Sequence, residues 1–227
     1  MKKKTSKPAP ASEEKRVLII DDHVMVRDGV AEIVEQADNL SVCGTASTAN
    51  EGLEALRKLK PDLVLVDITL PGKNGIEFIK DARVLQPDLL VLVMSMHDES
   101  LYADRVLRAG GRGYIRKQEG GDKLIEAMRR VLRGEIAVSE KVTGRLLEKF
   151  SGRVTMDSPL EGLSDRELEV FQLIGQGKTM KEIGQALHLS PKTIEVHRSH
   201  IREKLKVTSA AELVAYAARW NQTQGVT

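Results

Sequence analysis

Three aspartates in this chain are spaced so that they could share one divalent cation. Asp21 and Asp22 follow the apolar residues 17–20, and Asp67 follows the apolar residues 63–66. If these runs are neighbouring parallel strands, about 4.8 Å apart, the carboxylates meet at one edge of the sheet. Carboxylates that close repel one another, and a hard cation with oxygen ligands, such as Mg²⁺, relieves the repulsion.

Two further polar residues follow later apolar runs and suit a phosphoryl group. Ser95 follows residues 89–94, and Lys117 follows residues 113–115. A lysine is a point charge that can pair with a phosphoryl oxygen, and a carboxylate can be the nucleophile that forms an aspartyl phosphate. Asp67 lies centrally and is the predicted acceptor. One such residue alone is more often a cap, turn or surface residue, but all of them in this order favour a site.

The elements that must position these residues alternate between strands and helices. Short apolar runs without polar alternation indicate strands covered on both faces. The runs lie at residues 17–20, 40–46, 63–66, 89–94 and 113–115. Between them, apolar residues recur at helical spacing. Five such repeats over about 120 residues predict an α/β fold with a doubly wound, five-stranded parallel sheet, which we expect over residues 16–136.

The rest of the chain has no strand pattern and predicts a small all-helical domain of four helices over residues 160–222. Each helix start is marked by a capping box or by a cap followed by proline. These starts are Ser164/Glu167, Thr179/Glu182, Ser190-Pro191 and Ser209/Glu212. We interpret residues 137–159 as a linker with a short helix over residues 143–150, and residues 223–227 as a tail.

Composition argues against membrane and secreted proteins. The longest apolar run is far shorter than the roughly 20 residues of a membrane span, and no apolar signal segment follows the basic N-terminus. The single cysteine, Cys43, cannot form an internal disulfide. We therefore expect a cytoplasmic protein without a membrane partner. Residues 1–16 carry six Lys or Arg against two Glu, and residues 1–15 are interpreted as a disordered basic arm.

Four separated motifs in the first domain resemble bacterial two-component response regulators of the NarL/FixJ type. They are VLIIDDH (17–23), LVLVDITLPGKNG (63–75), VMS (93–95) and GYIRK (113–117). The resemblance extends over roughly residues 16–222. It implies that a sensor histidine kinase donates a phosphoryl group to Asp67. It also implies no enzymatic activity beyond self-catalysed phosphoryl transfer to Asp67 and hydrolysis from it.

The resemblance also assigns a set of Mg²⁺ ligands. Asp22 would bind the cation directly, and Asp21 mostly through water. Asp67 would contribute its carboxylate, and Thr69 its backbone carbonyl. Val24 stands where relatives often carry proline, which affects the shape of the loop and not the ligands.

In the same family a switch couples the Ser95 position to the aromatic residue three positions before the lysine, here Tyr114. Ser95 would hydrogen-bond the phosphoryl group and Lys117 would pair with it. Tyr114 would rotate inward as Ser95 moves; the alternative is a half-buried tyrosine on an edge strand. His23 and His97 lie near the site and are interpreted as loop residues.

Residues 163–205 resemble the LuxR-type helix-turn-helix. Ile194, Ile201 and Leu205 share one stripe of the second helix, which must face the core. Val196 then lies on the exposed side, where a thymine methyl group is a natural partner in the major groove. An ordinary solvated helix face is the alternative. The resemblance places base contacts at Glu195, Val196 and Ser199, and DNA-backbone contacts near Lys192, Thr193 and His197.

The last helix carries a stripe of small and apolar residues that permits close helix approach. Its members are Ala210, Leu213, Val214 and Ala217. The stripe could be core packing alone, or also the dimer seam that the family uses. The implied partners are double-stranded promoter DNA and a second copy of the phosphorylated chain, with RNA polymerase as a further candidate.

Two other functions stay open at this point. A haloacid-dehalogenase-like phosphatase also uses an aspartate nucleophile on a parallel sheet. That chemistry generally places a second aspartate two residues after the nucleophile, where this chain has Thr69. A DNA-binding regulator that no longer uses phosphate is the other alternative, although every residue that the transfer needs is present.

Overall fold

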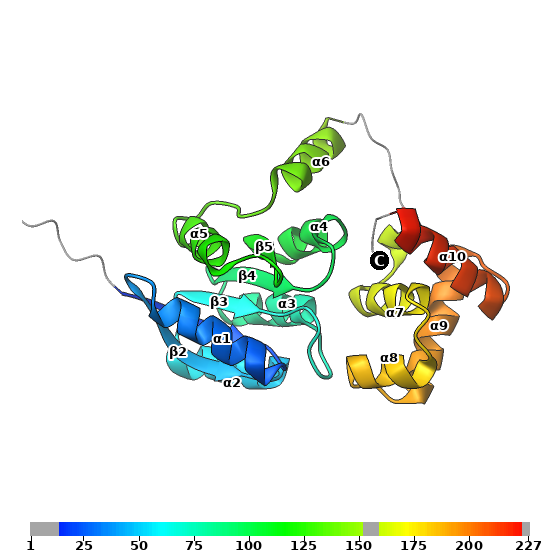
Figure 1. The fold of residues 1–227 in the computed structure, drawn as a ribbon, viewed down its shortest axis with the longest axis horizontal. Helices are drawn as coiled ribbons and strands as arrows, with labels where there is room; N and C mark the ends of the chain where they lie inside the picture. Colours follow the sequence, from blue (N-terminus) through cyan, green and yellow to red (C-terminus); the bar gives the residue numbers. More distant parts are fainter. Residues whose placement is uncertain (1–13, 152–158, 224–227) are drawn as a thin grey trace, which may run out of the picture.

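The computed structural model describes residues 14–151 and 159–223, and Figure 1 shows its two domains. The N-terminal domain contains the predicted parallel sheet, in the strand order β2-β1-β3-β4-β5. The strands are β1 (Lys15–Ile20), β2 (Leu40–Ala46), β3 (Leu63–Val66), β4 (Leu90–Ser95) and β5 (Gly113–Arg116). Lys15 belongs to β1, so the predicted basic arm extends one residue too far. Residues 1–13 of that arm lie outside the described residues.

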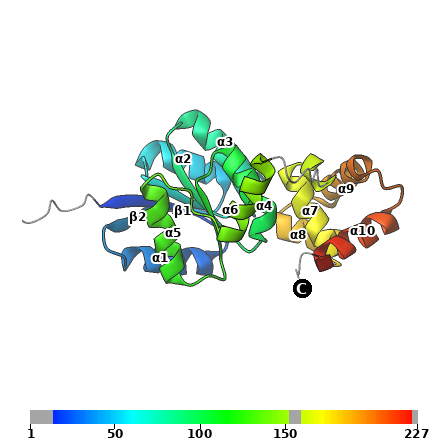
Figure 2. The ribbon, with the colours of Figure 1, turned by 90° about the horizontal axis from the view of Figure 1, so that it is seen from above.

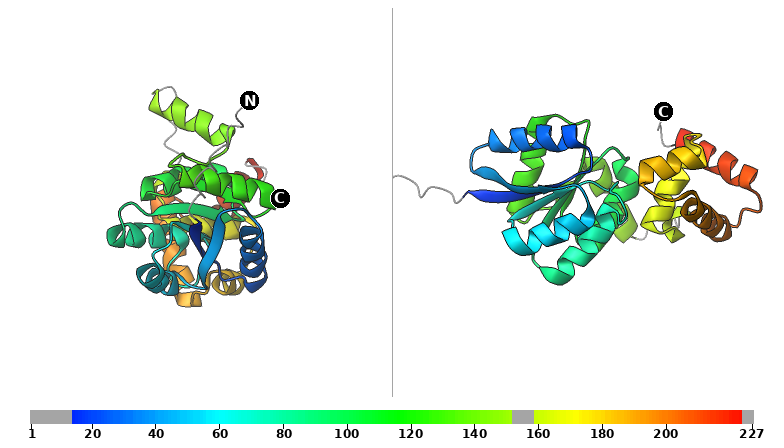
Figure 3. Two further views of the ribbon diagram at one scale, coloured as in Figure 1. Left: turned by 90° about the vertical axis from the view of Figure 1, so that its left-hand side faces the viewer. Right: turned by 90° about the horizontal axis from the view of Figure 1, so that it is seen from below.

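Helices cover both faces of the sheet, as Figures 2 and 3 show. One face packs against α1 (Val24–Glu35) and α5 (Gly121–Leu132), and the other against α2 (Ala49–Leu59), α3 (Gly75–Leu85) and α4 (Glu99–Ala109). Successive strand residues point to opposite faces. Val17 and Ile19 therefore join the core under α1 and α5, while Leu18 and Ile20 join the other core. The doubly wound α/β prediction is confirmed.

The loop after β3 returns very close to the strand end. The Gly75 amide donates to the Ile68 carbonyl at 2.8 Å. A Cβ atom at Gly75 would lie 2.0 Å from the Asp67 backbone carbonyl oxygen. Asn74 caps α3 in a reciprocal capping box with Glu77. This fixed turn holds the backbone of Asp67 in place.

The segment predicted as a linker is partly structured. Ala137 forms a bridge to Gly113 and accepts a hydrogen bond from the Tyr114 amide at 2.8 Å. Helix α6 (Glu140–Phe150) begins three residues earlier than predicted. Residues 152–158 of the predicted linker lie outside the part that the structure describes.

The C-terminal domain consists of a 3₁₀ turn and four helices. They are η1 (Pro159–Gly162), α7 (Asp165–Gly175), α8 (Met180–Leu187), α9 (Pro191–Leu205) and α10 (Ala210–Thr223). Reciprocal capping boxes open α7 at Ser164 and α8 at Thr179, and Ser190 caps α9 ahead of a proline. At Ser209 the box is incomplete, because the Glu212 carboxylate accepts from Thr208 instead.

The two domains pack against each other. Figures 1 and 2 show α7 and α8 beside the N-terminal domain, close to α3 and α4. One cluster of buried apolar residues runs from the sheet face under α2, α3 and α4 into the core of the helical domain. In the part of the chain that the structure describes, no helix has the length and apolar character needed to cross a bilayer.

Candidate functional site

The predicted acidic site forms at the carboxyl ends of β1 and β3. Ligand atoms of Asp21, Asp22, His23 and Asp67 all lie within 4.8 Å of one another. Asp21 is fully buried, and Asp67 is only 3% exposed. The parallel topology places β1 and β3 side by side in register, and this pairing brings the carboxylates together.

Lys117, which follows β5, completes the site from the other side. Its Nζ lies 2.7 Å from both Asp21 Oδ2 and Asp67 Oδ2, and its side chain is 6% exposed. Burial raises the pKa of Asp67 to about 6, and the Asp21 charge adds to this, although Lys117 opposes it. Burial alone would lower the pKa of Lys117, but Asp67 and Asp21 raise it overall. The site is therefore a buried ion cluster in which negative charge exceeds positive charge.

The donor set fits a hard divalent cation. Asp67 Oδ1 is buried and accepts no hydrogen bond from the described residues. An unpaired buried carboxylate oxygen is unfavourable, and coordination by Mg²⁺ would satisfy it. Asp22 is partly buried and offers further oxygens, one of which lies 2.8 Å from His23 Nδ1. Thr69 lies two residues after Asp67, and its role as a carbonyl ligand stays a prediction.

The two residues predicted to form the switch are both buried. Ser95 ends β4, and its Oγ accepts a hydrogen bond from the His97 amide at 3.3 Å. Tyr114 is 3% exposed, so it is not the half-buried tyrosine of the alternative interpretation. Its hydroxyl donates to the His97 carbonyl at 2.9 Å, and burial raises its pKa. His97 thus binds both of these residues through its backbone.

His97 is more than the loop residue that the sequence indicated. Its Nε2 lies 2.9 Å from Thr69 Oγ1, and its ring centroid lies 4.9 Å from that of Tyr102. The Tyr102 hydroxyl donates to Gln172 Oε1 of α7 at 2.9 Å. Burial, reinforced by the Lys117 charge, lowers the pKa of His97 to about 4, so its ring is neutral at pH 7. No spacing signal could have found this connection, because its members come from distant elements.

Helix α9 presents the predicted DNA contacts. Ile194 and Ile201 are fully buried, which confirms the core-facing stripe. The contact candidates lie on the other side of the helix. Lys192, Glu195, Val196 and Ser199 are exposed, while Thr193 and His197 are half-buried. The docked N-terminal domain therefore does not bury the four exposed candidates.

The four residues of the predicted dimer seam on α10 differ in burial. Leu213 and Ala217 are fully buried in the core of their own domain. Ala210 and Val214 are exposed, Val214 to 43%. Leu213 and Ala217 therefore belong to the core packing that the stripe also allowed, and the dimer seam stays a prediction. Only Ala210 and Val214 are free to face a second chain.

Comparison with known proteins agrees with this arrangement. The family "Response regulator receiver domain" matches residues 17–129, and "Bacterial regulatory proteins, luxR family" matches residues 161–217. "Response regulator GacA" of Pseudomonas aeruginosa is 35% identical over 204 residues, which are 90% of this chain and 95% of that protein. "Transcriptional regulatory protein LiaR" of Bacillus subtilis is 36% identical over 206 residues, with coverage of 90% and 97%. The chain belongs to the response regulators of the NarL/FixJ type.

Solved structures of response regulators support the same conclusion. RcsB of Salmonella typhimurium has a TM-score of 0.64 at 28% identity, covering 91% of this chain and 98% of that one. RcsB bound to the promoter P1flhDC with phosphomimetic BeF₃⁻ has a TM-score of 0.61 at 29% identity, covering 91% and 100%. This response regulator is thus a transcription regulator with a receiver domain and a LuxR-type DNA-binding domain. Family membership favours that interpretation over the phosphatase alternative.

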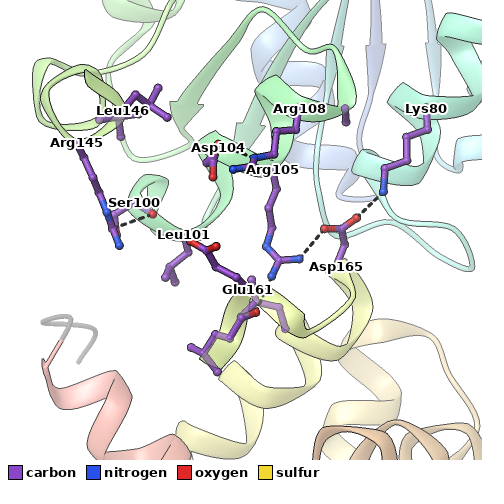
Figure 4. Close-up of a pocket in the computed structure, with 14 residues that line it drawn as sticks. Lys80, Ser100, Leu101, Asp104, Arg105, Arg108, Arg145, Leu146, Glu161 and Asp165 are labelled. Atoms are coloured by element: carbon purple, nitrogen blue, oxygen red, sulfur yellow. Dashed lines mark hydrogen bonds and ion pairs between the residues drawn. The ribbon is translucent and has the colours of Figure 1, made fainter. Parts of the chain in front are cut away.

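Charged and polar groups join the receiver to the DNA-binding domain. Figure 4 shows Lys80 and Arg105 of the receiver both directed at Asp165, at 2.9 Å and 3.0 Å. Arg105 also donates to the carbonyls of Leu160 and Leu163, each at 2.8 Å. The contacts border a pocket between α4, α6, η1 and α7. They fix the start of α7 against the receiver.

Proposed function

We propose that this response regulator accepts a phosphoryl group on Asp67 from a histidine of a sensor kinase, and that it binds promoter DNA in the cytoplasm as a phosphorylated homodimer. The observation that carries the proposal is the buried cluster of Asp21, Asp67 and Lys117. Within this cluster Asp67 Oδ1 is buried and has no hydrogen-bond partner among the described residues, so it is available to a cation. We infer no other enzymatic activity.

The chemistry follows from the protonation state of the cluster. With a pKa of about 6, Asp67 is mostly ionised at pH 7 and can act as a nucleophile. A carboxylate oxygen forms a bond to phosphorus while the bond from phosphorus to the kinase imidazole nitrogen breaks. Asp21, Asp22 and Asp67 would hold Mg²⁺, which supplies positive charge for the phosphoryl oxygens. Lys117, already 2.7 Å from Asp67 Oδ2, would pair with one of them.

The proposed switch begins at the contact between Ser95 and His97. Ser95 Oγ accepts a hydrogen bond from the His97 amide, and we expect it to move from this position to donate to a phosphoryl oxygen. That movement would disturb His97, whose carbonyl binds Tyr114 and whose ring contacts Tyr102 at the domain interface. We therefore expect Ser95→Ala to be phosphorylated but to gain little DNA affinity.

DNA binding rests on α9 and on the RcsB structures. One of these is described as RcsB bound to promoter DNA, and another as two RcsB dimers on two parallel DNAs. In this chain, Val196 and Lys192 are exposed and available to a major groove and to phosphate. Because domain docking leaves Val196 and Lys192 exposed, we expect phosphorylation to act on the association of two copies of the chain. RNA polymerase is a further candidate partner.

Labelling with a small phosphodonor tests the proposal. Acetyl phosphate should label wild-type chain with Mg²⁺ and fail to do so in EDTA. Asp67→Asn should not be labelled. Asp28→Asn, an exposed aspartate on α1, is the matched control and should be labelled normally. Label that persists in Asp67→Asn, or that forms equally in EDTA, would contradict the proposal. A wild-type chain that takes no label would favour a regulator that no longer uses phosphate.

A further inference from the structure

A histidine of the DNA-binding domain reaches the acidic site of the receiver. His188 follows α8, and its Nε2 lies 3.2 Å from Asp22 Oδ2. The Asp22 side chain is 13% exposed, and the His188 side chain is 50% exposed. This contact joins the turn of the helix-turn-helix directly to a predicted Mg²⁺ ligand.

Both carboxylate oxygens of Asp22 lie close to an imidazole. His23 Nδ1 lies 2.8 Å from Asp22 Oδ1, and His188 Nε2 faces the other oxygen. A cation bound directly by Asp22 needs at least one of these oxygens. His23 belongs to the receiver, and its side chain is 63% exposed, so it can turn away within its own domain. The contact from His188 depends on how the two domains pack.

One arginine fixes the position of His188 relative to the receiver. Arg166 of α7 donates through Nη2 to the Leu187 carbonyl at 2.6 Å, directly before His188. The same nitrogen lies 3.3 Å from the carbonyl of Gly72, in the loop that follows Asp67. The His188 backbone is left-handed, with φ of 53°, and caps α8. The turn is thus held by the domain interface and by its own fold.

We propose that His188, which the domain interface holds on Oδ2, competes with the divalent cation for the Asp22 carboxylate, so that metal binding and domain docking oppose each other before any phosphoryl transfer. The proposal rests on the proposed function, because it takes Asp22 as a metal ligand. Coupling between two binding events is reciprocal. If the cation weakens docking, docking must weaken cation binding by the same factor.

Mg²⁺ affinity of the full chain tests this coupling. We would titrate Mg²⁺ and follow the amide signals of the acidic loop by NMR. His188→Gly removes the imidazole and suits the left-handed backbone, because glycine has no Cβ. The Mg²⁺ Kd should fall about two- to fivefold, the range expected for the loss of one partly exposed side-chain contact. His200→Ala removes another exposed imidazole, the one near Glu167 and not near Asp22, and should leave Kd unchanged.

Hydrogen exchange gives the reciprocal measurement. Adding Mg²⁺ to the wild-type chain should speed amide exchange at the interface residues of α7, and should do so less in His188→Gly. A wild-type chain that binds Mg²⁺ with the same Kd as His188→Gly overturns this inference and leaves the proposed function intact. A wild-type chain that binds no Mg²⁺ overturns both.

Discussion

Removing the positive charge of Lys117 should destabilise the receiver strongly unless Mg²⁺ is present. Lys117→Met replaces the lysine with an apolar side chain of similar length, and it leaves Asp21 and Asp67 facing each other with no positive charge between them. Breaking a buried ion pair by deleting one partner costs about 3–5 kcal/mol. Asp67 can limit this loss by taking up a proton, because its pKa is already about 6 and would rise without Lys117. We therefore expect about 3 kcal/mol at pH 7, the lower end of that range.

Urea unfolding in EDTA and in Mg²⁺, followed by circular dichroism, measures this effect. Mg²⁺ should restore more stability to Lys117→Met than to wild type, since the cation replaces the missing charge. Lys123→Met is the matched control, because Lys123 is 69% exposed and pairs with Glu119 on the surface. That change should alter the free energy of unfolding by about 0–1 kcal/mol. Equal losses for the two variants in EDTA would refute the argument that Lys117 compensates a buried acidic cluster.

Three other predictions follow from the same structure. In EDTA, the free energy of unfolding should fall by up to about 3 kcal/mol as pH rises from about 4 to 6. Over this range Asp67 is ionised in the unfolded chain but still largely protonated in the folded one, because burial raises its pKa from the ordinary 3.8 to about 6. The stability difference between wild type and Asp67→Asn should change over this pH window, and a constant difference would count against it. Gly75→Ala should lower the free energy of unfolding, measured by thermal unfolding, by about 1–3 kcal/mol, because the new Cβ meets the Asp67 carbonyl. Gly144→Ala should not destabilise the protein, because a Cβ atom there has no neighbour within 4 Å. Lys192→Ala should weaken binding to all DNA sequences alike and lower the slope of log affinity against log salt concentration by about one. Val196→Ala should reduce the preference at one base position and leave this slope unchanged. The opposite pattern would mean that α9 is rotated differently on DNA.

The acidic site could be predicted because its residues follow a simple rule. Apolar runs identify the strands, and parallel strands bring their carboxyl ends to one edge. Asp21, Asp67 and Lys117 therefore had to converge, and the structure places the lysine 2.7 Å from both carboxylates. Helix starts could be predicted equally well from the sequence, because capping side chains bind backbone groups within three or four residues.

Contacts between distant elements could not be predicted in this way. The contacts of His97 with Thr69 and Tyr114, and of His188 with Asp22, give no signal in the sequence, because the two residues of each pair come from different elements or domains. The seam on α10 shows a related limit. Spacing reveals a stripe that includes Leu213 and Ala217, but it does not say whether the stripe meets its own core or another chain. That outcome depends on how α7 and α10 pack.

The most direct test of the account is the affinity of the purified chain for promoter DNA, measured by footprinting before and after phosphorylation. A coupling of typical size, about 1–3 kcal/mol, predicts a gain of about 5- to 150-fold in the phosphorylated chain. Asp67→Asn should show no gain under the same treatment. Unchanged affinity in a chain whose Asp67 is fully labelled would contradict the claim that phosphorylation at this site controls DNA binding.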